Sequence, residues 1–312
     1  MRVYYCDHHE IPLPPGHKFP LRKYRLIREA LESAGGFDLQ PAPSAPIDVI
    51  ELAHDPEYVR AFVEGTLASQ AMRRIGFPWS AGLVQRTLAS AGSTLQCAHD
   101  VFERGIAGGL AGGTHHAFYA EGSGFCVFND IAIAIRALRR EGRIRRAAVV
   151  DLDVHQGDGT AAIFSGDADV LTFSMHGANN FPFRKQQSAI DVELTDGTGD
   201  AAYLERLEAT LPRVWGFEPE ILFFQAGVDA LKTDRLGRLA LTHAGLEARD
   251  RLVLEGARRR KIPVVITLGG GYSEPIEATV EVHANTFRMA ARSLYNGSCQ
   301  NAPSSSLPPH LP

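Results

Sequence analysis

The segment VVDLDVHQGDGT, residues 149–160, places three aspartates and a histidine directly after a run of apolar residues. In an extended chain alternate side chains point to the same side, so Asp151, Asp153 and His155 would project together. A carboxylate buried without a partner costs several kcal/mol, so two of them beside a core strand need cations or strong hydrogen-bond donors. A bound metal ion would meet that need.

The expected metal ligands come from two places in the chain. Asp153 and His155 can ligate one ion, and Asp229, which follows another apolar run, is the expected third ligand. Three protein ligands of N and O type, with a position left for water, match a catalytic zinc site better than a closed structural one. Two carboxylates also suit Fe²⁺ or Co²⁺, so the spacing predicts a site and leaves the metal open among these ions.

A tandem histidine pair in the motif GGTHHAF, His115 and His116, is the second feature with catalytic potential. It follows a small, glycine-rich segment in which the backbone can approach a ligand closely. A histidine that transfers protons needs a partner that fixes its tautomer, usually a carboxylate. Asp151 and Asp158 are not needed as metal ligands, so both are candidates for that task.

The elements that must position these residues alternate between strand and helix patterns. Five short apolar runs are expected strands: Val3–Tyr5, Ala147–Val150, Val170–Ser174, Ile221–Gln225 and Val264–Leu268. Three segments have apolar residues near helical spacing and are expected helices: Asn129–Arg140, Ala201–Leu211 and Thr242–Arg260. This alternation predicts an α/β fold with parallel βαβ units, in which helices cover both faces of a mostly parallel sheet.

A single three-layer α/β/α domain is expected over residues 1–295, because no proline- or serine-rich linker interrupts them. The polar, proline-rich residues 296–312 are expected to form a disordered tail. Ligands of such sheets bind at the carboxyl ends of the strands. Polar or glycine-rich groups follow four of the apolar runs: Asp151 with Asp153 and His155, Met175-His176-Gly177, Gly227-Val228-Asp229, and Gly269-Gly270-Gly271-Tyr272.

The composition excludes several classes of protein. The chain has 312 residues, of which 45% are hydrophobic and 22% charged, so it can bury a sizeable core. The net charge is -4 and there is no run of basic residues, so the sequence does not predict a surface that binds nucleic acid. No apolar stretch is long enough to span a membrane, and the N-terminus lacks the features of a signal peptide. Together with four scattered cysteines, this predicts a cytoplasmic protein.

Six motifs in order now identify a resemblance. GGTHHAF, GFCVFND, VVDLDVHQGDGT, FSMHG, QAGVDA and LGGGY are similar to those of the zinc-dependent histone deacetylase family, within the arginase/deacetylase superfamily. The resemblance covers residues 1–292. Gln156 after the histidine, together with HKFPLRKY and HDPEYV, most resembles the class IV branch and its bacterial relatives.

The resemblance implies a role for each residue of the motifs. The zinc ligands would be Asp153, His155 and Asp229, in agreement with the spacing. His115 would pair with Asp151, and His116, the general base, with Asp158. Tyr272 matches the tyrosine that hydrogen-bonds the substrate carbonyl. Substrate contacts are expected from Gly124, whose carbonyl receives the scissile amide N–H, from the tunnel walls Phe125 and Phe181, and from Gly270. The family also binds a structural K⁺, which implies a site at Asp151, Asp153, His155, Ser174 and Met175.

The implied function is a zinc-dependent amidohydrolase that removes acetyl or longer acyl groups from lysine side chains of proteins or peptides. A monomer or weak oligomer is expected. Zinc would activate a water, His116 would move its proton, and Tyr272 would donate to the developing oxyanion.

Three alternatives remain. A binuclear manganese hydrolase of the ureohydrolase type would need the pattern D-x-H-x-D, but Gly157 stands at the required place and Asp158 one residue later. An acetylpolyamine amidohydrolase uses the same chemistry on a small acyl-amine. It usually carries a long insertion, which the segment between Pro41 and Arg86 does not provide. A non-catalytic acyl-lysine binding module could lose the metal ligands, yet all of them are present.

Overall fold

Eight strands form one sheet in the computed structural model, which describes residues 1–298. Their order in the sheet is β2-β1-β3-β8-β7-β4-β5-β6, and every neighbouring pair is parallel. The strands are β1 (Arg2–Tyr5), β2 (Asp38–Pro41), β3 (Ile106–Gly109), β4 (Ala147–Asp151), β5 (Val170–Gly177), β6 (Ile190–Leu194), β7 (Ile221–Gln225) and β8 (Val264–Thr267). The expected α/β class and parallel sheet are therefore confirmed.

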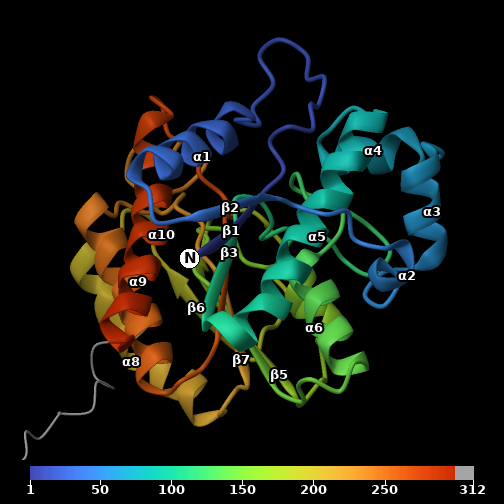
Figure 1. Cartoon of the computed structure of the whole chain (residues 1–312). Helices are drawn as coiled ribbons and strands as arrows, with labels where there is room; N and C mark the ends of the chain where they lie inside the picture. The colour runs from blue at the N-terminus through green and yellow to red at the C-terminus, as the bar shows by residue number, and fades with distance from the viewer. Residues whose placement is uncertain (299–312) are drawn as a thin grey trace, which may run out of the picture.

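Helices cover both faces of the sheet, so the molecule has the three expected layers (Figure 1). One face packs against α1 (Arg22–Ala34), α8 (Asp200–Gly216), α9 (His243–Arg259) and α10 (Glu277–Ser298). The other packs against α5 (Ala81–Arg104) and α6 (Asp130–Arg140), with α2 (Ile47–Ile50), α3 (Pro56–Glu64) and α4 (Ser69–Ile75) beyond. The short α7 (Asp158–Ile163) follows β4.

The central strands are apolar on both sides because each contributes to two separate cores. In β7, Ile221 and Phe223 join the core under α5 and α6, whereas Leu222 and Phe224 join the core under α8 and α9. All four side chains are fully buried. This explains why the parallel strands read as continuous apolar runs rather than as alternating patterns.

Local sequence sets where two of the expected helices begin. The Asn129 side chain accepts a hydrogen bond from Ala132 N at 3.0 Å and thereby caps α6. Thr242 caps α9 in the same way, through Gly245 N at 3.1 Å. Caps of this kind satisfy backbone N–H groups that have no partner inside the helix.

The sequence patterns missed three strands and misplaced one boundary. Two of the missed strands, β2 and β6, lie at the edges of the sheet and expose polar residues, and β3 contains two glycines, so none resembles a long apolar run. Helix α10 continues to Ser298, so the expected domain end at residue 295 falls inside it. Packing of the preceding turns can carry a helix through residues of low helix propensity. The rest of the expected tail, residues 299–312, lies outside the described residues.

The carboxyl ends of β3, β4, β7 and β8 meet at one edge of the sheet, as their parallel pairing requires. The turns after these strands contain most of the residues with chemical potential. None of the helices within residues 1–298 is long and apolar enough to cross a membrane.

Candidate active site

Three ligand-type side chains converge beyond the ends of β4 and β7. Nδ1 of His155 lies 2.9 Å from Oδ1 of Asp153 and 3.1 Å from Oδ2 of Asp229. One ligand atom from each of the three residues lies within 4.8 Å of the others, and all three side chains are almost fully buried. This spacing and donor set fit one divalent cation of the zinc type.

Both carboxylates are also held in place by donors outside the triad. Oδ2 of Asp153 accepts hydrogen bonds from Gly270 N at 2.8 Å and from Gln225 Nε2 at 3.1 Å. Oδ1 of Asp229 accepts one from Val154 N at 2.8 Å. The ligand geometry is therefore fixed by surrounding groups, as is usual for metal sites.

Proton affinities in this cluster reflect the concentrated negative charge. Burial acts to lower the pKa of His155, but the hydrogen bonds to Asp153 and Asp229 outweigh it and raise that pKa to about 10. Burial, with the nearby Asp153 charge, raises the pKa of Asp229 to about 7. Without a metal the imidazolium of His155 is thus the cation that balances the two carboxylates. A bound metal ion would replace the proton on this ring and supply the positive charge in its place.

Each histidine of the tandem pair has its own aspartate. His115 Nδ1 donates to Asp151 Oδ2 at 2.7 Å, and His116 Nδ1 donates to Asp158 Oδ1 at 2.6 Å. The two imidazole rings lie 4.1 Å apart between centroids, and all four residues are buried. The pairing expected from the resemblance is the pairing found in the geometry.

The two histidines differ in proton affinity despite their similar partners. Burial acts to lower the pKa of His115, but the charges of Asp151 and Asp153 outweigh it and raise that pKa to about 9. Burial, followed by the charge of His115, lowers the pKa of His116 to about 4 even though Asp158 opposes this. At neutral pH His116 is therefore the unprotonated member of the pair, which is the state a general base needs.

A buried carboxylate shapes the turn that presents the tandem histidines. Asp130 accepts hydrogen bonds from Gly113 N at 3.0 Å and from Thr114 N at 2.8 Å, and a further one from the Thr114 hydroxyl at 2.6 Å. Gly113 has a φ of +74°, and a Cβ there would lie 2.9 Å from the backbone nitrogen of Gly269. The two glycine-rich turns can therefore touch only because neither has side chains at the contact.

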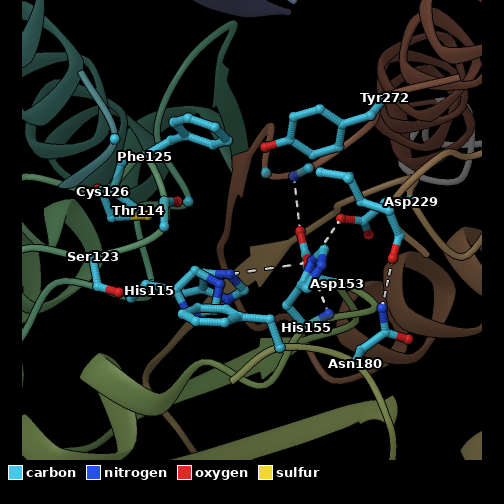
Figure 2. Close-up of a pocket in the computed structure, with 18 of the residues that line it drawn as sticks. Thr114, His115, Ser123, Phe125, Cys126, Asp153, His155, Asn180, Asp229 and Tyr272 are labelled. Carbon is cyan, nitrogen blue, oxygen red and sulfur yellow. Dashed lines mark hydrogen bonds and ion pairs between the residues drawn. The ribbon is translucent and has the colours of Figure 1, made fainter. Parts of the chain in front are cut away.

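Aromatic side chains form the walls above the histidines. The Phe181 ring meets the His116 ring edge to face at 4.9 Å, and the Phe125 ring lies 6.4 Å from that of Tyr272. Figure 2 shows Phe125 and Tyr272 on opposite sides of the space above Asp153. Gly124 packs closely against two of these rings, because a Cβ there would lie 2.7 Å from His116 and 3.2 Å from Phe181.

The Tyr272 hydroxyl points into the same space, and burial raises its pKa well above the usual range. It therefore stays protonated and able to donate at any ordinary pH. Its backbone N donates to Asp234 Oδ2 at 2.6 Å. Lys23 of α1 is buried behind it and donates to the carbonyl oxygen of Gly269 at 3.0 Å and to that of Gly271 at 3.4 Å.

These groups line one open cavity of about 590 Å³. Ten of the residues expected at the site line it directly: His115, His116, Gly124, Phe125, Asp153, His155, Phe181, Asp229, Gly270 and Tyr272. Asp151 and Asp158 lie behind the histidine pair. Ser174 and Met175 lie on β5 away from the cavity lining, with Ser174 paired in register to Asp151 of β4.

Sequence reasoning missed Asp130, which holds the turn of the tandem histidines, and three further residues that hold this site. Lys23 supports the glycine turn before Tyr272, Gln225 holds Asp153, and Asn180 donates to Leu236 O at 2.8 Å at the cavity edge (Figure 2). A signal existed for Lys23, because it shares the buried face of α1 with Ile27 and Leu31, four and eight residues on. A lysine on such a face needs buried acceptors.

Comparison with known proteins agrees with this geometry. The Histone deacetylase domain family matches residues 17–288. The chain belongs to the histone deacetylase family. An uncharacterized protein of Picosynechococcus is 46% identical over 300 residues, covering 94% of this chain and 98% of its own. Histone deacetylase 2 of Arabidopsis thaliana is 30% identical over 290 residues, covering 88% and 74%.

A solved structure supports the fold of this histone deacetylase family member. The crystal structure of an acetylpolyamine aminohydrolase from Burkholderia pseudomallei superposes with a TM-score of 0.76, at 24% identity, over 94% of this chain and 99% of that one. Family membership makes the chain a hydrolytic deacetylase acting on an acyl-amine. Asp158 pairs with His116, so it does not provide the second aspartate that a binuclear ureohydrolase site would need.

Proposed function

We propose that this protein is a zinc-dependent deacylase that hydrolyses the side-chain amide of acylated lysine in proteins or peptides. The observation that carries the proposal is the convergence of a ligand triad, a neutral histidine and a protonated tyrosine hydroxyl on one cavity. Amide hydrolysis requires a polarised carbonyl, an activated water and a protonated leaving amine. These three groups, with a metal ion, could meet all of the requirements.

Asp153, His155 and Asp229 would hold the metal, which when bound would polarise the acyl carbonyl and lower the pKa of a water. The donor set of two carboxylates and one imidazole favours Zn²⁺ and also accepts Fe²⁺ or Co²⁺. Metal analysis of the protein purified without added metal, followed by activity of the Zn²⁺-, Fe²⁺- and Co²⁺-loaded forms, would identify the native ion.

His116 is the proposed general base and later the general acid. Its Nδ1 is engaged by Asp158, so Nε2 is the ring nitrogen available to take a proton from water and return it to the leaving amine. His115, held by Asp151, would keep a positive charge beside the reacting centre. Tyr272 would donate its hydroxyl hydrogen to the carbonyl oxygen as negative charge develops there.

The walls suit a lysine side chain. Phe125 and Phe181 would line the slot occupied by the apolar methylene groups, and the carbonyl of Gly124 would accept the amide N–H. Gly270 lies at the floor, where its N–H already holds Asp153.

Charge at the cavity favours lysine over an acetylated polyamine. Arg74 and Arg238 line the cavity, each paired with a carboxylate outside the lining, Glu121 and Asp196 respectively. Within the described residues the lining carboxylates are Asp153 and Asp229, both members of the ligand triad. A polyamine keeps ammonium groups after acetylation, and these need acidic partners at the mouth. An acyl-lysine peptide needs none.

One experiment can identify both the preferred acyl chain and the class of substrate. A lysine peptide bearing acetyl through myristoyl groups is compared with acetylated polyamines under the same conditions. Turnover of any acyl-lysine peptide above the polyamines supports the proposal, whereas preference for acetylpolyamines would replace it with the small-molecule alternative. A zinc-loaded protein that binds the peptides but hydrolyses none would instead be a binding module.

We further propose a structural K⁺ held by backbone oxygens of Asp151, Asp153 and His155 with Ser174 and Met175. Its support is the adjacency of β4 and β5, which brings these buried residues together. The thermal midpoint should rise when Na⁺ is exchanged for K⁺ at constant ionic strength.

We also propose that the protein belongs to the class IV branch and that it is cytoplasmic. Gln156 and the motifs HKFPLRKY and HDPEYV support the branch. The buried, unpaired thiols of Cys6, Cys97 and Cys126 suit a reducing compartment. A monomer or weak oligomer is proposed, and sedimentation at micromolar concentration would test it.

A further inference from the structure

The connection between β5 and β6, residues 178–189, forms one side of the cavity through Phe181 and Phe183. We call these residues the wall segment. Phe181 is half-buried against His116, whereas Phe183 is 84% exposed at the rim. Loops of this length without secondary structure are usually mobile unless polar groups hold them.

The first half of the wall segment is held by two side chains of its own. Asn180 is buried, donates to Leu236 O at 2.8 Å and accepts from Arg238 N at 3.2 Å. The ammonium group of Lys185 folds back and donates to the carbonyl oxygens of Asn180 and Pro182, each at 2.6 Å. These contacts fix the backbone on both sides of Phe181.

The second half is held from outside, by Gln156. Its Nε2 donates to Gln186 O at 2.7 Å, and its Oε1 accepts from Gln186 N at 2.8 Å. A single side-chain amide thus pairs with both backbone groups of one residue, much as a neighbouring strand would. Nε2 also donates to Asp191 Oδ1 at 2.8 Å, and Asp191 Oδ2 accepts from Ser188 N at 2.8 Å.

Only a side chain with both a donor and an acceptor at glutamine length can make this set of contacts. Gln156 is 1% exposed, and its loss would leave both Gln186 backbone groups and one Asp191 oxygen without the side chain that ties them to the buried end of β4. Without these hydrogen bonds the second half of the wall segment would be free to shift, and water would take the place of the lost partners.

Gln156 directly follows His155, a residue of the ligand triad, but it is not among the residues that line the cavity. The imidazole faces the two carboxylates, and the amide of the next residue holds the wall segment. Two consecutive residues therefore link the reacting centre to the aromatic wall.

We propose that Gln156 is a positioning residue that sets the place of Phe181 relative to the ligand triad and so determines how tightly the substrate side chain is bound. The inference rests on the proposed function, in which Phe181 contacts the lysine methylene groups. Such apolar contacts act equally in the ground state and the transition state, so their loss raises KM more than it lowers kcat.

The first test follows the wall segment itself and needs no activity. Amide hydrogen exchange of a peptide covering residues 178–189 is measured in the metal-loaded wild type, Gln156→Ala and Gln186→Ala. Gln186 is exposed and takes part only through its backbone, so its alanine variant is a matched control. We expect exchange about tenfold faster in Gln156→Ala alone. Unchanged exchange there, or an equal increase in Gln186→Ala, would overturn the proposal.

The second test asks whether Gln156 acts through Phe181. With an acyl-lysine peptide, Gln156→Ala should raise KM about tenfold while kcat stays within about threefold and the metal content is unchanged. In a Phe181→Ala background the same substitution should change KM less than about twofold, because the group it positions is gone. An undiminished effect in that background, or loss of metal, would overturn the proposal.

The two tests separate the inference from the proposed function. A wild type inert towards every acyl-lysine peptide would contradict the proposed function, and the exchange measurement would still decide whether Gln156 holds the wall segment. Normal turnover with no effect of Gln156→Ala on KM would contradict the inference alone.

Discussion

Oδ2 of Asp229 lies 3.1 Å from Nδ1 of His155, although the two residues are 74 positions apart in the chain. The parallel pairing of β4 with β7 produces this contact, because both residues follow the carboxyl ends of adjacent strands. The same pairing places Gln225, the last residue of β7, against Asp153. The triad is thus a consequence of strand order rather than of local sequence.

Removal of Asp229 should abolish metal binding. Asp229→Ala takes away one of three ligands and leaves a single carboxylate to balance the ion. Metal analysis after dialysis should fall from about one equivalent to near zero. Asp48→Ala, at a surface carboxylate that is 72% exposed, should keep its metal and serves as the control. Stoichiometric metal in Asp229→Ala would show that another residue is the third ligand.

Metal affinity should weaken as pH falls. In the metal-free protein the pKa of His155 is raised to about 10 and that of Asp229 to about 7. Between these values one proton must leave as the metal binds, so the apparent Kd should rise about tenfold for each unit of decreasing pH. Below about pH 7 a second proton competes and the dependence should steepen.

Chelator competition at several pH values from 6 to 9 measures this dependence. The metal-free protein must remain folded across the range, which far-ultraviolet circular dichroism checks. A Kd that is constant with pH would contradict the proposed ligand set, because no proton would then be displaced.

Replacing His116 and replacing His115 should change different kinetic properties of the enzyme. His116→Ala removes the proposed base and should lower kcat about 10²–10⁴-fold while the metal stays bound. His115→Ala removes a positive charge beside the centre and should also raise the pKa of His116, because the charge of His115 helps to lower it. The acidic limb of the pH–rate profile should therefore move to higher pH in His115→Ala. Wild-type turnover by His116→Ala would rule out its role as base.

Much of the fold could be predicted because its central strands are apolar on both sides. The run Ile221–Gln225 coincides with β7, and the expected helices near residues 130 and 243 begin at the capping residues Asn129 and Thr242. The edge strands β2 and β6 could not be found this way. One side of each faces solvent, so their composition resembles that of loops.

The motifs identified the residues of the site. They did not identify the residues that hold those side chains in place. Spacing predicted that Asp153 and His155 project together, and the resemblance alone divided the aspartates between ligand and histidine-partner roles. Contacts such as Lys23 with Gly269, or Gln156 with Gln186, join distant segments through backbone atoms. Backbone partners leave no residue-specific signal, so only the three-dimensional structure reveals them.

The turn that carries the tandem histidines should depend on Asp130. Asp130→Ala leaves the backbone N–H groups of Gly113 and Thr114 without partners in a buried turn. Each such group costs about 1–3 kcal/mol, so the free energy of unfolding should fall by about 3 kcal/mol. Denaturant unfolding measures this, with the exposed Asp48→Ala variant as control. A loss below about 0.5 kcal/mol would show that water replaces the carboxylate.

Tyr272 is proposed to act only in the transition state, and its replacement tests that directly. Tyr272→Phe removes one hydroxyl but keeps the ring, so the contact with Phe125 and the shape of the cavity should remain. An oxyanion donor of this kind contributes about 10²–10³ in kcat, and KM should change little because the donor acts mainly when charge develops. Metal content and thermal midpoint should match the wild type. A rise in KM with unchanged kcat would instead assign Tyr272 to substrate binding.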